Sequence, residues 1–118
     1  MATGYGVHYL VEYAGCDPEK IKYVKDVEPV LLDAAQKSRA TVLNYHFHQF
    51  EPFGVTGIIM IAESHFAIHT FPETGFAAFD VLTCGPMDAM IAVEELKHRL
   101  GARKTRVRTF KRGIDEGG

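Results

Sequence analysis

The chain has 118 residues, of which 47% are hydrophobic and 24% are charged, and its formal net charge is −2. This balance excludes a disordered tail or a fibrous protein and predicts one globular domain over residues 1–118. The slightly acidic charge gives no general attraction for the phosphates of nucleic acids, so we expect no nucleic-acid partner.

The cysteines and the apolar segments bear on where the protein works. No basic segment followed by an apolar run opens the chain, so we expect Cys16 and Cys84 to be free thiols in a cytoplasmic protein. The longest apolar runs carry charged or histidine residues and fall short of the ~20 residues that span a bilayer. We therefore expect no membrane association.

The first part of the chain predicts a strand followed by a helix. Residues 6–13 combine β-branched and aromatic side chains, and residues 15–18 supply turn chemistry. Because proline is disfavoured inside a helix, we expect a short turn first and the main helix from about Asp26, with Pro29 in its first turn. Its expected buried stripe is Val30, Leu31, Ala34 and Ala35.

The middle of the chain predicts strands separated by turns. The expected strands cover residues 41–50, 55–62, 65–70 and 76–84, and the expected turns cover residues 51–54 and 71–75. The segments on either side of Ser64 could also form one interrupted strand.

The last part of the chain predicts a helix and a final strand. Pro86 and Asp88 introduce the helix, and Gly101 stands where a C-terminal cap belongs. The apolar positions at helical spacing are Met90, Ile91, Val93, Leu96 and Leu100. The order β-α-β-β-β-β-α-β predicts an α/β (α+β) two-layer sandwich, in which an antiparallel sheet carries two helices on one face.

Basic residues crowd the C-terminal end of the chain. Alternating charges on an edge strand commonly solvate that edge and block pairing with another sheet, and we favour this interpretation over nucleic-acid binding. The residues are Arg99, Arg103, Lys104, Arg106, Arg108, Lys111 and Arg112.

The residues with the most chemistry lie on two neighbouring apolar segments. Ser64 and His69 share one segment, and Cys84 ends the next, so side-by-side strands could bring a hydroxyl, a base and an acid together. The nucleophile motif Gly-x-Ser-x-Gly is absent around Ser64. Taken alone, these residues favour structural interpretations: Ser64 as a surface turn serine, His69 as a hydrogen-bonded strand histidine and Cys84 as a small buried side chain.

A metal site is not expected. The four histidines in and beside these strands lack a cysteine or carboxylate at ligand spacing, and Asp80 is expected to bond a backbone group or face solvent. These histidines are His46, His48, His65 and His69, and apart from His69 we interpret them as structural.

Four ordered motifs resemble the short prokaryotic S-adenosylmethionine decarboxylases, and the resemblance covers nearly the whole chain. The motifs are Glu51-Pro52-Phe53-Gly54-Val55-Thr56-Gly57, Ala62-Glu63-Ser64-His65, Ile68-His69-Thr70-Phe71-Pro72-Glu73 and Ala77-Ala78-Phe79-Asp80-Val81-Leu82-Thr83-Cys84-Gly85.

The resemblance implies a proenzyme that cuts itself between Glu63 and Ser64. The products would be a beta chain of residues 1–63 and an alpha chain of residues 64–118, with Ser64 converted to a pyruvoyl group. Its ketone would condense with the amine of S-adenosylmethionine as a Schiff base and accept the electrons left when carbon dioxide departs. The product would supply aminopropyl groups for spermidine and other polyamines.

The resemblance also implies roles for individual residues. His69 would be the proton acceptor in processing, and Cys84 would be the proton donor to the substrate carbon. Phe50 would pack on the adenine or sulfonium, and Glu73 would hold the ribose hydroxyls. Two processed copies would form a homodimer with the active sites at their interface.

Two departures from the family pattern leave alternatives open. Phe71 stands where tryptophan is common, and Gln49 stands where arginine is usual. A pyruvoyl-dependent arginine or ornithine decarboxylase on the same scaffold is therefore a second hypothesis. An unprocessed binding module is a third.

Overall fold

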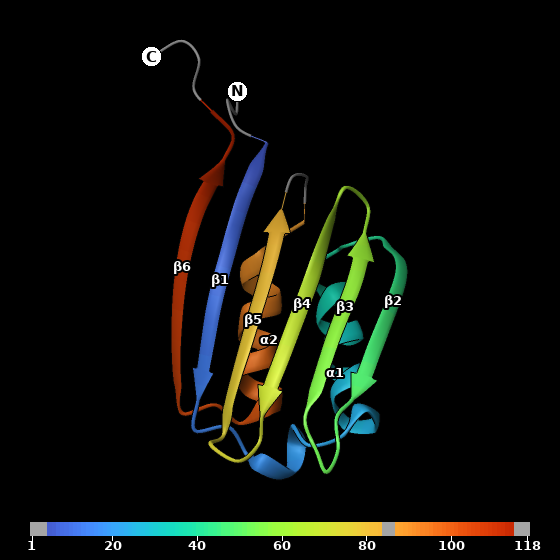
Figure 1. Ribbon diagram of the computed structural model, residues 1–118. Coiled ribbons are helices and arrows are strands. Elements are labelled where there is room, and N and C mark those ends of the chain that lie inside the picture. Colours follow the sequence, from blue (N-terminus) through green and yellow to red (C-terminus); the bar gives the residue numbers. More distant parts are fainter. Residues whose placement is uncertain (1–4, 84–86, 115–118) are drawn as a thin grey trace.

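The computed structural model describes residues 5–83 and 87–114. Six strands, two α-helices and a short 3₁₀-helix follow one another along these residues (Figure 1). They are β1 (Gly6–Ala14), η1 (Pro18–Lys20), α1 (Val24–Lys37), β2 (Val42–Gln49), β3 (Val55–Ile61), β4 (Ser64–Phe71), β5 (Phe76–Thr83), α2 (Ala89–Leu100) and β6 (Lys104–Arg112).

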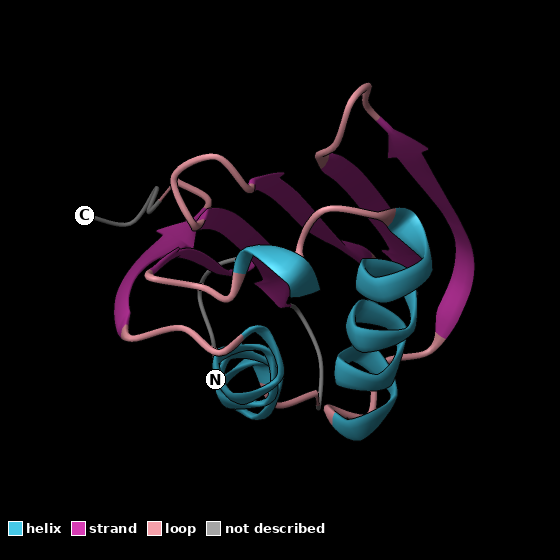
Figure 2. Ribbon diagram, turned by 90° about the horizontal axis from the view of Figure 1, so that it is seen from below, coloured by secondary structure: helices cyan, strands magenta, loops and turns pink. Residues whose placement is uncertain are grey.

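The strands form one antiparallel sheet in the order β2-β3-β4-β5-β1-β6, and both α-helices cover the same face (Figure 2). This confirms the predicted two-layer α+β sandwich. No helix in the described ranges has both the length and the hydropathy that crossing a membrane requires.

The segments on either side of Ser64 are two strands and not one interrupted strand. A two-residue turn at Ala62 and Glu63 reverses the chain, so that Ile61 pairs with Ser64 across the β3–β4 hairpin. The suggestion of one interrupted strand is therefore wrong, because the break is a complete chain reversal.

Helix α1 begins at Val24, before the expected start at about Asp26, and Pro29 lies inside the helix beyond its first turn. Proline at this depth removes one intrahelical hydrogen bond. The residue before the helix, Tyr23, offers no side-chain cap, so local sequence gives no start signal there. The expected buried stripe is confirmed: Val30, Leu31, Ala34 and Ala35 are buried, and Val27 joins them.

Helix α2 has the expected caps but a different buried stripe. Asp88 accepts a hydrogen bond from the Met90 backbone at 3.0 Å, and Gly101 ends the helix at φ 70°, a left-handed conformation that favours glycine. Of the apolar residues expected at helical spacing, Met90 and Ile91 are exposed and do not join the core. The face toward the sheet instead carries Ala89, Ala92, Val93, Leu96 and Leu100.

The core lies between the helices and one face of the sheet. Every second residue of a strand points to the same face, and in the central strands these positions are buried. Phe66 and Phe79 meet edge to face there, with ring centroids 5.6 Å apart. Burial of these side chains against the helices is the main apolar stabilisation of the fold.

The other face of the sheet, which we call the open face, has no covering layer in the described residues (Figure 2). Large apolar side chains on it are 36–55% exposed: Leu10, Ile58, Met60, Phe71 and Phe110. Strand alternation and register also place five of the six histidines there: His8, His46, His48, His65 and His69.

Replacing the buried Ile68 with alanine should lower the free energy of unfolding by about 2–5 kcal/mol, because it leaves a cavity between the sheet and the helices. The same change at Ile114, which is 81% exposed, should stay within about 0.5 kcal/mol of the wild type. Urea titrations at one protein concentration measure both values. Equal effects of the two substitutions would contradict this description of the core.

Candidate active site

Ser64 lies directly after a strained turn. Glu63, the second turn residue, has φ 67°, a left-handed conformation that costs a non-glycine residue roughly 1 kcal/mol or more. The next residue, Ser64, begins β4 with its side chain turned toward the helix side, as that of its partner Ile61 is. The peptide bond between Glu63 and Ser64, which the family resemblance led us to expect as the cleavage point, therefore connects a strained residue to the first residue of a strand.

The hydroxyl of Ser64 is buried, and it has no hydrogen-bond partner among the described residues. Buried hydroxyls are normally hydrogen-bonded, because leaving one unbonded costs about 1–3 kcal/mol. An unbonded hydroxyl next to a strained peptide is free to approach the carbonyl carbon of that peptide. This geometry suits the serine to nucleophilic attack on its own backbone.

His69 lies on the open face of β4 and is hydrogen-bonded to a residue that the sequence did not single out. Its Nδ1 and the Oγ1 of Thr56 on β3 are 3.1 Å apart. The strand register also places His48 on the far side of Thr56, so His48, Thr56 and His69 form a row across three strands. Thr56 belongs to the motif at residues 51–57, but only the strand register shows that it lies opposite His69.

One chain does not bring Ser64 and His69 together. They are five positions apart along one strand, which corresponds to about 17 Å at 3.4 Å per residue. The separation is odd, so their side chains also leave opposite faces of the sheet. The expected meeting of hydroxyl and base does not occur within one copy.

Phe50 and Glu73 lie at the other end of the sheet from Ser64. Phe50 follows β2, is 47% exposed, and meets the His48 ring edge to face at 4.6 Å. Glu73 is in the exposed turn between β4 and β5. Figure 1 shows that the β2–β3 and β4–β5 connections share one end of the sheet, while the β3–β4 turn lies at the opposite end.

Gly54 in the β2–β3 connection lies close to the β4–β5 connection. A Cβ atom at Gly54 would lie 3.8 Å from Phe50 and 3.9 Å from Pro72, the neighbour of Glu73. Phe50 and Glu73 are therefore on adjacent turns.

Cys84 lies outside the described residues, and its neighbour Thr83 ends β5.

Asp80 is hydrogen-bonded to two side chains. Its Oδ2 accepts from His8 at 2.8 Å and from His65 at 3.0 Å. The expectation for Asp80 is wrong because β1, which carries His8, inserts next to β5 in the sheet.

Cys16 is a free thiol, as expected, and it is buried. Burial raises the pKa of this thiol to about 11, so it stays protonated near neutral pH and is a poor nucleophile. Burial also raises the pKa of the neighbouring Tyr13, whose hydroxyl donates to the Val93 carbonyl at 2.8 Å. Both groups are structural.

Gln49 has a structural role that bears on its departure from the family pattern. Its Oε1 accepts a hydrogen bond from the Val24 backbone at 2.7 Å and so caps helix α1. Its Nε2 lies 3.0 Å from the Lys22 carbonyl and 3.1 Å from the Gly54 carbonyl. The amide is committed to the backbone on the helix side of the sheet, so this departure gives no support for another substrate.

Similarity to known proteins assigns the chain to a class of enzyme. The sequence profile of S-adenosylmethionine decarboxylase matches residues 7–113. The chain therefore belongs to the S-adenosylmethionine decarboxylase family, which confirms the resemblance found in the motifs.

Curated relatives carry the same name. The S-adenosylmethionine decarboxylase proenzyme of Thermodesulfovibrio yellowstonii is 44% identical over 92% of this chain and 82% of its own. The proenzyme of Pyrococcus furiosus is 43% identical over 94% and 81%.

Solved structures agree with the fold. The adenosylmethionine decarboxylase of Aquifex aeolicus superposes with a TM-score of 0.88 at 35% identity, covering 99% of this chain and 98% of that one. The Trypanosoma brucei enzyme is similar in fold alone, with a TM-score of 0.67 at 16% identity over 86% of this chain and 44% of that one.

Replacing Gln49 with leucine should destabilise the protein by about 1–2 kcal/mol, because the first turn of α1 loses its cap. The control is the same change at Gln36, an exposed residue of α1, where the effect should stay within about 0.5 kcal/mol. Urea titration measures both variants. A Gln49 variant as stable as the Gln36 variant would show that the cap contributes nothing.

Proposed function

We propose that this protein decarboxylates S-adenosylmethionine with a pyruvoyl group made from its own Ser64. The observation that carries the proposal is the buried Ser64 hydroxyl, which no described residue bonds, beside the left-handed Glu63. The relatives of the chain are named proenzymes of this decarboxylase. The product would serve as the aminopropyl donor for polyamines. The names of the relatives favour S-adenosylmethionine over arginine or ornithine as substrate.

Cleavage would begin at the hydroxyl of Ser64. Its oxygen adds to the carbonyl carbon of Glu63, and the amide nitrogen leaves as an amine, so an ester replaces the peptide bond. Loss of the Cα proton of residue 64 then expels the Glu63 carboxylate. Water finally replaces the nitrogen as a carbonyl oxygen and releases ammonia. Relief of the strain at Glu63 would favour the first step.

A pyruvoyl ketone at residue 64 supplies an electron sink for the electrons left on the substrate carbon when carbon dioxide departs. The residues present fit such a group, since Ser64 would be the source of the ketone and its hydroxyl has no hydrogen-bond partner within residues 5–83 and 87–114. Cys84, outside the described residues, would give a proton to the substrate carbon. An ordinary thiol has a pKa of about 8.5 and is mostly protonated near neutral pH.

Phe50 and Glu73 would bind the rest of the substrate. The exposed face of an aromatic ring attracts a positive charge, which suits Phe50 to the sulfonium or the adenine. A carboxylate accepts hydrogen bonds from a pair of hydroxyls, which suits Glu73 to the ribose. The edge contact from His48 would keep the Phe50 ring in place.

The site would be shared between two copies of the chain. Ser64 lies at one end of the sheet, whereas His69, Phe50 and Glu73 lie toward the other end. A two-fold arrangement of open faces would place the Ser64 end of one copy against the other end of its partner. The exposed apolar side chains of the open face support such packing, because water is displaced from them.

In this arrangement His69 would act on the partner. Its imidazole, oriented by Thr56 at 3.1 Å, would take the Cα proton of residue 64 in the other copy during cleavage. The distance of about 17 Å between positions 64 and 69 within one strand argues against action within one copy. Two identical sites would result per homodimer.

Replacing Ser64 with alanine should leave one uncut chain and lower decarboxylation by more than about a thousandfold, because no ketone can form. The wild type should give two fragments, and the mass of the C-terminal one should match a pyruvoyl and not a serine terminus. Ser38→Ala, a change at the end of α1, should leave cleavage intact. A wild-type chain that stays uncut, or an active Ser64→Ala variant, would contradict the proposal.

Shared sites predict rescue between two defective variants. Ser64→Ala and His69→Ala should each stay uncut when expressed alone. When they are expressed together in equal amounts, about half of the chains that carry Ser64 should pair with a partner that carries His69, and these should be cut. Intact mass spectrometry separates the products. Mixed dimers without any cut chain would refute sharing of the site.

A further inference from the structure

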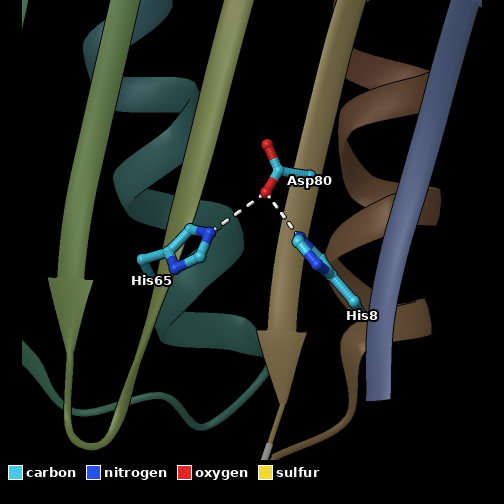
Figure 3. A group of neighbouring side chains, drawn as sticks. All are labelled: His8, His65 and Asp80. Atoms are coloured by element: carbon cyan, nitrogen blue, oxygen red, sulfur yellow. Dashed lines mark hydrogen bonds and ion pairs between the residues drawn. The ribbon is translucent and has the colours of Figure 1, made fainter. Parts of the chain in front are cut away.

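Three side chains on the open face form a cluster that the proposed chemistry does not use. His8 on β1, His65 on β4 and Asp80 on β5 converge from three strands, and both imidazole Nε2 atoms contact the same Asp80 Oδ2 (Figure 3). The distances are 2.8 Å from His8 and 3.0 Å from His65, and the two rings meet edge to face. The side chains are 19%, 39% and 25% exposed for His8, His65 and Asp80.

Two histidines and a carboxylate could in principle hold a metal ion, since their ligand atoms lie within 4.8 Å of one another. The surroundings of His8 argue against a metal ion at this cluster. Arg112 places its Nη1 3.2 Å from the His8 Nδ1, and a guanidinium can only donate hydrogen bonds. The Nδ1 must then be the acceptor, which puts the ring proton on Nε2 and leaves no lone pair there for a metal.

The cluster is therefore a directed chain of hydrogen bonds. Arg112 donates to His8, and His8 donates to Asp80. The same carboxylate oxygen accepts from His65. Asp80 is held from one side by His8 and restrains His65 on the other.

His65 is the second residue after the proposed cut, next to Ser64. Before cleavage the β3–β4 turn holds Ser64 in place, and Ser64 is in register with β3 through Ile61. The register between β4 and β5 starts one residue later, with His65 opposite Leu82. Once the bond between residues 63 and 64 is broken, residue 64 becomes a chain end, and chain ends fray unless they are tied down.

We propose that Asp80, acting through His65, is a positioning residue that holds the new chain end at residue 64 after cleavage. His8 and Arg112 fix the carboxylate from the other side. The inference rests on the proposed cleavage, and it gives this cluster a part in the reaction without contact with the substrate. A reacting group that moves by about 1 Å can lose a hundredfold in rate, so this restraint bears directly on turnover.

The test compares Asp80→Asn in two backgrounds, the cleavable wild type and the uncut Ser64→Ala chain. In the cut protein, amide hydrogen exchange over residues 65–68 should speed up by at least about tenfold. In the uncut chain the turn still holds β4, so the same substitution should change exchange by less than about twofold. A role only in the stability of the sheet would raise exchange equally in both backgrounds and would overturn the inference.

Turnover gives a second readout. The cut Asp80→Asn enzyme should lose about 10–100-fold in kcat with KM changed less than about threefold, because the residues proposed to bind substrate are untouched. His98→Gln on α2 is the matched control and should change neither value. Unchanged kcat in a fully cut Asp80→Asn enzyme would overturn the inference.

The outcomes also separate this inference from the proposed function. If the wild type is never cut, the proposed function fails and the inference fails with it. If the wild type is cut and only the exchange and kcat results go against expectation, the inference alone fails. Should Asp80→Asn not fold, His65→Phe breaks the same hydrogen bond while leaving Arg112, His8 and Asp80 in place, and the same exchange comparison decides.

Discussion

The register of β4 is the constraint on which the rest of the structure depends. Ile61 pairs with Ser64 at the turn, and every later residue of β4 follows from that pairing. Strand alternation then sends Phe66 and Ile68 into the core and sends His65 and His69 to the open face. A slip of one residue would exchange these two sets, exposing the core side chains and burying both histidines. The same apolar burial that stabilises the fold therefore also fixes the proposed chemistry.

This constraint explains why the proposed chemistry is divided between the ends of the sheet. The β3–β4 hairpin places Ser64 opposite Ile61, but an extended strand cannot fold His69 back onto Ser64. Phe50 follows β2 and Glu73 follows β4, so both lie at the end of the sheet nearer to His69. A sheet face that the described residues leave uncovered, and whose two ends would carry different parts of the site, is suited to two-fold pairing, because each end would meet the other kind of end in the partner.

The sequence predicted those features that arise from local patterns. Alternation and helical spacing identified every strand and both α-helices, and glycine marked the end of α2 at Gly101. The start of α1 was missed because its cap comes from Gln49, which lies 25 residues further along the chain. The partners of Asp80 and the bond between Thr56 and His69 were missed for the same reason, since strand order decides them. The distance between Ser64 and His69 follows from the rise per residue of a strand, once both residues are known to lie on the same strand.

The strand order has a consequence for the fragments that a cut after Glu63 would leave. The first fragment would hold β1, α1, β2 and β3, and the second would hold β4, β5, α2 and β6. In the sheet, β1 of the first fragment lies between β5 and β6 of the second, while β3 borders β4. Strands of the two fragments therefore alternate in the sheet, and the fragments cannot dissociate unless the hydrogen bonds of β1 to β5 and β6 and those of β3 to β4 are all broken.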